Sequence, residues 1–419
     1  MDHSPSLTPT VSSDNTSLMA TAGTFSLRGN LVFAHGGGTT AVMNASLYGV
    51  IREALRHPQV EGIYGARYGA QGLIEGNFID LRREPSAVID ELPRTPASVL
   101  GSSRRRIEPE DYDRILGNLR RYSVRFLFFN GGDGTMLGAA ELARLAAERG
   151  HDLRVVGIPK TVDNDMVRTD HTPGYGSAAR YLAATALELG RDSEAIPFPI
   201  NILETIGRNA GWLAAATTLA ARSPEDGPQL VYVPEIPFVR DRFLADVARV
   251  YKQLGRLLVV VSEGIKDEHG EPVFYTSGES DRDGFGRPLA GNVSVELARL
   301  IGRELGLRVR NDKPGLCARV SVAHVSPPDR EEAQQAGEVA VRHALLGVSG
   351  QMVTLERVSS SPYRCGFGLA PLAEVGGRER TMPREFMNEE GNYPTELFRR
   401  YALPLLGPDL PNFVRLSHA

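Results

Sequence analysis

The feature that most constrains the fold is a repeated local pattern. A short apolar run of β type is followed by a loop of glycine or small polar residues, and then by a helical stretch. The best strand candidates are six apolar runs at residues 30–34, 124–129, 154–158, 200–204, 230–233 and 257–261. Strands that alternate with helices form parallel sheets covered by helices. With 419 residues, we predict an α/β protein with two Rossmann-like three-layer domains and mostly parallel sheets.

The same pattern suggests boundaries along the chain. Residues 1–27 are rich in Ser, Thr, Asp and Pro, and we expect a disordered leader. One domain is predicted to comprise residues 28–173 together with 318–372, and a second to comprise residues 174–317. Beyond these, prolines separate short apolar pieces, so residues 373–419 are predicted to be a C-terminal extension that packs onto the body.

Composition excludes several classes of protein. The net charge of −4 gives no electrostatic reason to expect nucleic acid as a partner. No apolar run approaches about 18 residues, so we expect no membrane partner, and the N-terminus lacks a signal-peptide pattern. A cytoplasmic protein is the default expectation. The two cysteines, Cys317 and Cys365, cannot form a four-cysteine zinc site, and the histidines lack ligand spacing. Both residue types are interpreted as structural.

Residues 130–135 (Asn-Gly-Gly-Asp-Gly-Thr) form the first loop with chemical character. They follow an apolar run and precede a helix predicted at residues 136–149. Glycines let the backbone approach a phosphate, and the amides of a helix N-terminus favour negative charge. Asp133 would repel that phosphate unless a cation lay between them, which implies Mg²⁺. The alternative interpretation is a tight turn in which the aspartate caps the helix.

Residues 156–165 (Val-Gly-Ile-Pro-Lys-Thr-Val-Asp-Asn-Asp) give a sharper signal. They place Lys160, Asp163 and Asp165 within six residues, directly after a predicted strand. An aspartate can accept a proton from an attacking hydroxyl while a lysine neutralises a moving phosphoryl group. A solvated charged turn is the alternative, and it explains neither the density of charge nor its position.

Three further loops are weaker signals. The triple glycine at residues 36–38 lies between a strand and a helix predicted from about residue 42, and it could bind an anion or simply interrupt the chain. Arg208 follows a strand, where a guanidinium can hold phosphate or can be solvated. Glu263 could bind sugar hydroxyls or cap the next segment. The sequence has neither a P-loop nor a Gly-x-Gly-x-x-Gly opening, which argues against P-loop kinases and dinucleotide dehydrogenases.

Together, in this order and spacing, the loops resemble those of the phosphofructokinase family. The resemblance covers nearly the whole chain, extends through residues 169–179 and 206–212, and is greatest to bacterial pyrophosphate-dependent members. It implies a phosphotransferase that uses Mg²⁺ to phosphorylate the 1-hydroxyl of fructose 6-phosphate or a related sugar phosphate. The first domain would bind the phosphoryl donor and the second the sugar phosphate. A neighbouring subunit completes the family's acceptor site, which implies a homodimer or homotetramer.

The resemblance also implies roles for individual residues. Asp163 would be the base, and Asp133 would hold Mg²⁺. The other residues of the catalytic group would be Lys160, Thr161, Asp165 and Arg208. The donor would be bound by Gly38, Arg104, Gly132, Asp133, Gly134 and Thr135. The sugar would be bound by Thr161, Asp163, Ile206, Gly207, Arg208, Glu263, Arg310 and Arg319.

One departure from the family's pattern concerns the donor. Pyrophosphate users of the family typically carry an aspartate where this chain has Gly134, and that side chain obstructs the α-phosphate of a nucleotide. Lys160 occurs in pyrophosphate users and in some ATP users, so it does not discriminate. A glycine removes both bulk and charge, and we therefore expect ATP with Mg²⁺ as the donor. Pyrophosphate remains the alternative.

A second departure concerns the acceptor. Where the family usually has contacts to the 6-phosphate, this chain has Pro199, Leu316 and Ala318. The loss of polar phosphate contacts weakens such a site by about 1–3 kcal/mol each. Fructose 6-phosphate remains the default, and a different sugar acceptor in a specialised pathway stays open. An inactive regulatory homologue is a further alternative, disfavoured because the catalytic residues are all present.

Overall fold

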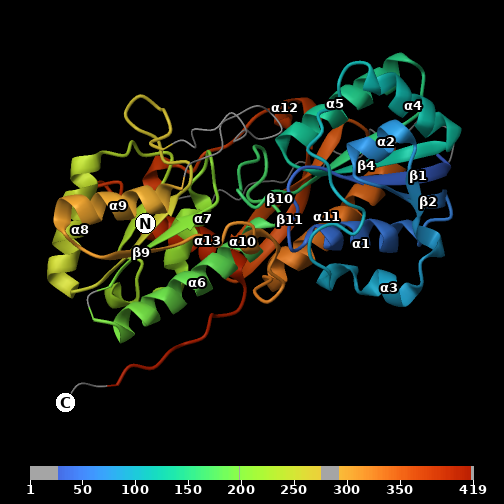
Figure 1. Cartoon of the computed structure of the whole chain (residues 1–419). Coiled ribbons are helices and arrows are strands. Elements are labelled where there is room, and N and C mark those ends of the chain that lie inside the picture. Colours follow the sequence, from blue (N-terminus) through green and yellow to red (C-terminus); the bar gives the residue numbers. More distant parts are fainter. Residues whose placement is uncertain (1–26, 198, 275–291, 417–419) are drawn as a thin grey trace, which may run out of the picture.

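The computed structural model describes residues 27–197, 199–274 and 292–416, which form two α/β units side by side (Figure 1). Within these residues, one sheet has seven strands in the order β11-β10-β5-β4-β1-β2-β3, and the other has four in the order β7-β8-β6-β9. The seven-stranded sheet comprises β1 (Gly29–His35), β2 (Val60–Ala66), β3 (Phe78–Asp80), β4 (Val124–Gly131), β5 (Arg154–Pro159), β10 (Gln351–Ser360) and β11 (Tyr363–Pro371). The four-stranded sheet comprises β6 (Ile200–Thr205), β7 (Leu230–Tyr232), β8 (Leu257–Ser262) and β9 (Val309–Asp312).

The strand pairing confirms the predicted fold class. Every pair in the four-stranded sheet is parallel, and in the seven-stranded sheet only the edge strands β3 and β11 are antiparallel. All six predicted strands are present. The sequence did not reveal the other five, because they lack a continuous apolar run. β9, for example, is a four-residue edge strand whose last three residues are exposed.

Helices cover both faces of each sheet. The helices are α1 (Met43–Ala54), α2 (Ala70–Glu75), α3 (Ser86–Asp90), α4 (Asp111–Arg121), α5 (Asp133–Glu148), α6 (Tyr175–Ala195), α7 (Trp212–Ala216), α8 (Arg240–Leu254), α9 (Val293–Leu305), α10 (Cys317–Val320), α11 (Pro327–Leu345), α12 (Leu372–Val375) and α13 (Glu396–Ala402). Alternate residues of the central strands enter opposite cores. Leu31 and Phe33 of β1 pack with α1 and α11, whereas Val32 and Ala34 pack with α4 and α5. The result is three layers in each unit.

One predicted helix boundary and one predicted helix need correction. The helix predicted at residues 136–149 begins earlier, at Asp133, whereas the one predicted from about residue 42 begins at Met43 as expected. No helix follows directly after residues 262–264. Residues 263–274 form turns and one isolated bridge, and the next helix in the described chain begins at Val293. The predicted leader lies outside the described residues except for residue 27.

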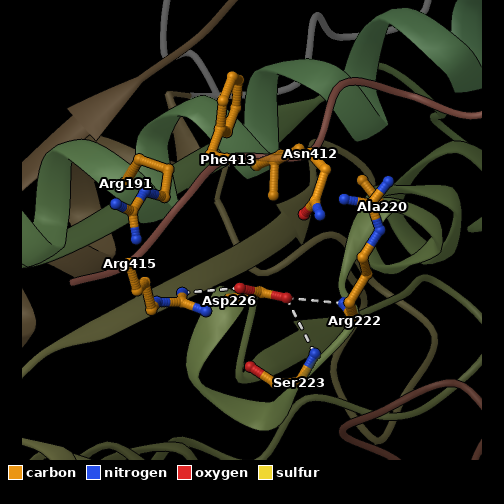
Figure 2. Close-up of a pocket in the computed structure, with 9 residues that line it drawn as sticks. Arg191, Ala220, Arg222, Ser223, Asp226, Asn412, Phe413 and Arg415 are labelled. Carbon is orange, nitrogen blue, oxygen red and sulfur yellow. Dashed lines mark hydrogen bonds and ion pairs between the residues drawn. The ribbon is translucent and has the colours of Figure 1, made fainter. Parts of the chain in front are cut away.

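The end of the chain packs onto the four-stranded unit. Phe398, Leu405 and Leu406 are buried in the same core as α6 and α7. The last segment then runs beside α6, where Arg222 donates to the carbonyl of Leu410 at 2.8 Å. Figure 2 shows this segment closing a small pocket in which Asp226 accepts backbone N–H bonds from Arg222 and Ser223 and pairs with Arg415. Among the described helices, none is long and apolar enough to cross a membrane.

Candidate active site

The loops with chemical character meet at one edge of the seven-stranded sheet. Strands β5, β4 and β1 are neighbours and parallel, so the loops that follow them lie at the same end. The amide of Lys160 donates to the carbonyl of Gly131 at 3.0 Å, and the amide of Gly36 donates to the carbonyl of Asn130 at 2.9 Å. Residues 36–38, 131–135 and 160–165 therefore lie side by side at this end of the sheet.

Gly36 and Gly131 pack against the side chain of Thr135. A Cβ atom at Gly36 or at Gly131 would lie 2.3 Å from the Thr135 hydroxyl oxygen, which is far too close. The hydroxyl therefore fills the space between two loops that only glycine permits. Gly37, with φ of +77°, completes the tight turn after β1. These glycines bring two strand ends together so that their amides can face a ligand.

Three cations surround Gly38. The ammonium of Lys160 donates to the carbonyl of Gly38 at 2.6 Å. A Cβ atom on Gly38 would lie 3.0 Å from a guanidinium nitrogen of Arg319 and 3.6 Å from one of Arg104. Burial, together with the charge of Arg319, lowers the pKa of Lys160 to about 8. Such a concentration of positive charge next to glycine amides suits a polyphosphate.

Arg319 is predicted to bind the sugar, and this role stays a prediction. Its guanidinium lies beside Gly38 and Arg104, two residues that are predicted to bind the donor. Burial and Arg104 lower its pKa, and Asp163 opposes this shift. Arg319 lies on the short helix α10, which follows β9 of the four-stranded unit. Its guanidinium reaches the loops of the seven-stranded unit. Arg319 therefore lies close to Gly38 and Arg104 and also to Asp163.

Carboxylates gather opposite these cations. Burial and the neighbouring charge of Asp165 raise the pKa of Asp163 to about 7. Burial, Glu379 and also Asp133 raise the pKa of Asp165 to about 6. The amide of Asp163 donates to the hydroxyl of Thr161 at 3.1 Å, which fixes the turn. Two interacting carboxylates of this kind titrate as a pair, and one of them can take up a proton near neutral pH.

The interpretation of Asp133 as a helix cap is not supported. The N-cap residue of α5 is Gly132, without a side-chain cap, and Asp133 is the first helical residue. Its carboxylate is close enough to Asp165 to raise the pKa of that residue. Gly134 follows, and a Cβ atom at this position would meet no atom within 4 Å. A Cβ atom on Gly132 would lie 3.8 Å from the carbonyl oxygen of Lys160. The start of α5 therefore has open space in front of it.

The ends of β6 and β8 form the other side of the site. Gly207 has φ of +130°, and its carbonyl accepts a hydrogen bond from the Ser262 hydroxyl at 2.5 Å. The amide of Glu263 donates to the carbonyl of Thr205 at 2.9 Å. Burial raises the pKa of Glu263, and the charge of Arg208 opposes the shift. Because the charge of Glu263 also raises the pKa of Asp163, this side of the site faces Asp163. Ile206 packs against the core beneath it.

Arg310 is not part of this group in the single chain. Its guanidinium contacts the carboxylate of Asp192 on α6 at 3.4 Å, on the exposed surface. Its role in sugar binding stays a prediction. Leu316 is also exposed, whereas Ala318 is buried.

The C-terminal extension supplies residues that the sequence did not reveal. The guanidinium of Arg380 donates to the carbonyls of Asn164, Thr169 and Asp170 at 2.9–3.0 Å. The hydroxyl of Tyr401 accepts from the Asn164 amide at 2.9 Å and donates to the Asp170 carbonyl at 2.7 Å. Asn164 has a φ of +55°, a left-handed conformation that asparagine tolerates better than most residues, and these bonds hold its side chain and its carbonyl in place. No sequence signal identified these two residues, since they sit among scattered prolines.

A buried polar network lies behind residues 160–174, the loop that is predicted to be catalytic and is called the catalytic loop below. His171 is bonded to Asp170 and to Glu332, both at 2.8 Å. Burial lowers the pKa of His171, but the bonds to the two carboxylates outweigh this effect and raise it to about 9. Arg357 pairs with Asp170 at 3.0 Å, and the Tyr363 hydroxyl donates to Glu332 at 2.6 Å. The network joins residues 161–174 to α11 and β11.

The comparison with known proteins decides the family. The phosphofructokinase family model matches residues 30–344. This chain belongs to the phosphofructokinase family. It is 37% identical over 394 residues to the pyrophosphate–fructose 6-phosphate 1-phosphotransferase of Rhodospirillum rubrum, which covers 93% of this chain and 97% of the relative. The phosphofructokinase fold and a phosphotransferase activity of the 6-phosphofructokinase type follow for this chain.

Two other similarities bear on specificity and fold. The chain is 34% identical over 360 residues to the sulfofructose kinase of Alkalicoccus urumqiensis, with coverage of 85% and 91%. The crystal structure of the pyrophosphate-dependent phosphofructokinase from Marinobacter aquaeolei superimposes with a TM-score of 0.83 at 34% identity, covering 92% of this chain and 94% of that one. The predicted family and architecture are confirmed.

Proposed function

We propose that this phosphofructokinase transfers the γ-phosphoryl group of ATP, with Mg²⁺, to the 1-hydroxyl of fructose 6-phosphate. The observation that carries the choice of donor is the open space at Gly134, where a side chain would meet no atom within 4 Å. A glycine there leaves room for the α-phosphate and adds no negative charge. The three cations around Gly38 then face the rest of the triphosphate.

The chemistry assigned to the chain's own residues is positioning, proton transfer and charge neutralisation. Asp163 accepts the proton of the 1-hydroxyl as its oxygen bonds to the γ-phosphorus, while the bond from that phosphorus to the bridging oxygen of ADP breaks. The pKa of Asp163, raised to about 7, makes it an effective base near neutral pH. Lys160, Arg104 and Arg208 offset the charge on the transferring group. Such pre-placed charges lower the barrier because they need no reorganisation during the reaction.

The carboxylates fit a magnesium ion. The mutual repulsion of Asp133 and Asp165 contributes to the raised pKa of Asp165, so a divalent cation between them would relieve it. Carboxylate oxygens are the ligands that Mg²⁺ prefers. We assign Asp133, with Asp165 beside it, to hold the ion together with donor phosphates. When bound, it neutralises charge on the phosphoryl oxygens.

A second candidate is the pyrophosphate-dependent reaction with the same acceptor. It is favoured by the names of the Rhodospirillum and Marinobacter relatives. Lys160, Asp163 and Asp165 would keep their roles, because pyrophosphate presents the same transferable group. What distinguishes the two candidates is the occupant of the space in front of Gly134.

A third candidate keeps the chemistry and changes the acceptor. One relative is named a sulfofructose kinase, and this chain has Pro199, Leu316 and Ala318 where the family's resemblance places 6-phosphate contacts. Arg310, which could serve that phosphate, pairs with Asp192 in the single chain. A sugar that carries a different group at its 6-position is therefore the alternative acceptor.

One experiment separates all three candidates. Purified protein is assayed with ATP and with pyrophosphate, each against fructose 6-phosphate, 6-deoxy-6-sulfofructose and fructose, with Mg²⁺ present and absent. The proposal expects the highest kcat/KM for ATP with fructose 6-phosphate. Turnover with pyrophosphate alone would overturn the donor, and a higher kcat/KM for another sugar would overturn the acceptor.

We also propose a homodimer or homotetramer. Arg310, on β9, and Leu316, in the turn that follows it, are both exposed. A second copy at this surface would cover Leu316 and bring further side chains toward the acceptor. Light scattering coupled to size exclusion measures the mass, and an active monomer at assay concentration would contradict the proposal.

A further inference from the structure

The polar network behind the catalytic loop contains an additional set of metal ligands. His171, Glu332 and Cys365 each offer one ligand atom, and these three atoms lie within 4.8 Å of one another. We propose that the three residues bind one Zn²⁺ ion, at a site separate from the magnesium site. The proposal does not depend on which donor or acceptor the enzyme uses.

The geometry needs only a small adjustment to become a zinc site. Nε2 of His171 lies 2.8 Å from Oε2 of Glu332. In a tetrahedral site with bonds of about 2.0–2.3 Å, ligand atoms are roughly 3.3–3.8 Å apart. The pair therefore opens slightly, and the thiol of Cys365, which now donates to the Gly366 carbonyl at 3.2 Å, turns inward. Three protein ligands leave a fourth position for a water molecule.

The neighbouring residues orient the ligands as they do in known zinc centres. The Nδ1 atom of His171 is bonded to Asp170, which directs Nε2 toward Glu332 and Cys365. A carboxylate behind a histidine ligand fixes the ring and raises its basicity. The Tyr363 hydroxyl donates to Oε1 of Glu332 and leaves Oε2 facing the histidine. Both supporting contacts are already in place.

Charge and softness favour zinc over magnesium here. Binding of Zn²⁺ displaces two protons to solvent, one from Nε2 of the His171 imidazolium and one from the Cys365 thiol. With one thiolate, one carboxylate and a neutral imidazole, the centre then has no net charge, and Arg357 already compensates Asp170. A buried centre that is neutral avoids the large desolvation cost of an unpaired charge. The thiolate and the imidazole are ligands that select Zn²⁺ over Mg²⁺. His171 and Glu332 are buried, whereas Cys365 is half-buried and leaves a path for the ion.

The three ligands come from parts of the chain that are far apart. His171 lies in the loop between β5 and α6 that also carries Asp163, Glu332 lies on α11, and Cys365 lies on the edge strand β11. A metal bond at this point would therefore hold the catalytic loop against the seven-stranded unit. We expect bound zinc to raise the melting temperature of the protein, because a ligand that binds only the folded state stabilises it.

The test uses the full chain and one matched pair of variants. Metal-free protein is titrated with Co²⁺ in excess Mg²⁺, and Zn²⁺ affinity is measured by competition with a chromophoric chelator. We expect one ion per chain, a thiolate-to-cobalt charge-transfer band, and a higher melting temperature with Zn²⁺. Cys365→Ser should abolish the band and weaken Zn²⁺ binding at least about tenfold. Cys317→Ser, which removes the exposed cysteine outside the network, should change neither.

The result that overturns the proposal is equally specific. Absence of the band in the unmodified protein, or equal Zn²⁺ affinity in the Cys365→Ser variant, would leave the network as an ion-pair cluster only. Glu332→Gln provides a second test, since it keeps the shape of the side chain. It should weaken Zn²⁺ binding while the circular dichroism spectrum of the metal-free protein stays unchanged. Neither outcome depends on catalytic activity.

Discussion

Two regions of the molecule position Asp163 and Asp165. They differ in how far a local sequence motif predicts what they do. The first comprises the loops at residues 36–38, 131–135 and 160–165, whose glycines and charges form recognisable motifs. The second is the part of the C-terminal extension that contains Arg380 and Tyr401, which has no motif and contacts the same loop from behind. The residues predicted to react and the residues that hold them in place therefore come from separate parts of the chain.

The contacts of the motif loops join these loops to one another. Lys160 reaches Gly38, and Thr135 fills the gap between Gly36 and Gly131. The extension instead provides hydrogen bonds to backbone carbonyls, which any sequence presents. Arg380 bonds three carbonyls of the loop that carries Asp163 and Asp165. If this division is correct, changes in the motif loops should alter chemistry, and changes in the extension should alter the position of the loop.

The largest effect is expected for Asp163→Asn. If Asp163 is the base, its loss should lower kcat at least about a hundredfold, because general-base catalysis contributes about that much. Asparagine keeps the shape, so the melting temperature should stay within a few degrees. Steady-state kinetics and thermal unfolding measure the two quantities. Asp113→Asn, on the exposed surface of α4, is the control, and comparable activity of the two variants would refute the assignment.

Gly134→Asp is expected to have the next largest effect. A carboxylate in the open space at the first turn of α5 would repel the phosphates of ATP. We expect kcat/KM for ATP to fall at least about tenfold, which corresponds to about 1.4 kcal/mol. The value for pyrophosphate should fall less.

The control for this change is Gly117→Asp. Gly117 lies on α4, and a Cβ atom there also meets no atom within 4 Å. The added charge is the same, but it lies far from the loops, so kcat/KM for ATP should not change. Equal losses for ATP and pyrophosphate in Gly134→Asp would remove the role of Gly134 in choosing the donor.

The pH dependence tests the charges of the motif loops directly. Below about pH 7 the pair of Asp163 and Asp165 takes up a proton and the base is lost, so kcat/KM should fall about tenfold per pH unit. Above about pH 8 Lys160 loses its charge, and kcat/KM should fall again. Lys160→Arg stays charged at these pH values and should remove the alkaline decline. A profile without an acidic decline would contradict the raised pKa of the pair.

The smallest effect is expected from the extension. Arg380→Met removes the bonds to the carbonyls of Asn164, Thr169 and Asp170, and the loop should shift slightly. We expect kcat to fall about tenfold, because small displacements of reacting groups are costly, and the melting temperature to fall as well. Rapid-mixing kinetics separates this loss from a slower product release.

Arg384→Met is the matched control for Arg380→Met. Arg384 lies in the same extension and bonds the carbonyls of Met387, Asn388 and Glu389, away from the catalytic loop. Its loss should lower the melting temperature and leave kcat nearly unchanged. If both variants lost the same activity, the extension would act through stability alone, and the comparison between the two regions would fail.

On the acceptor side, a motif leaves the direction of two long side chains open. Arg319 and Arg310 are both predicted to bind the sugar, and that role stays a prediction. The guanidinium of Arg319 lies beside Gly38 and Arg104, and that of Arg310 pairs with Asp192 on the surface. The direction of a long side chain depends on what surrounds it, and the alignment of a motif carries no such information.

The architecture and the loops of the candidate site could be predicted from the sequence. Apolar runs that end in glycine-rich loops specify parallel strands, and parallel strands place their carboxyl ends at one edge. Lys160, Asp163, Asp165, Asp133 and Gly134 could therefore be predicted as neighbours without coordinates, since local sequence fixes both the strand and the turn that follows it.

Only the tertiary structure shows which residues from distant parts of the chain contact these loops. Arg380 and Tyr401 reach the catalytic loop across more than 200 residues of sequence. His171, Glu332 and Cys365 meet in the same way. Their contacts depend on how α11, β11 and the extension pack, and packing is set by the shape of the whole core instead of by any local pattern. For this reason neither group left a signal in the sequence.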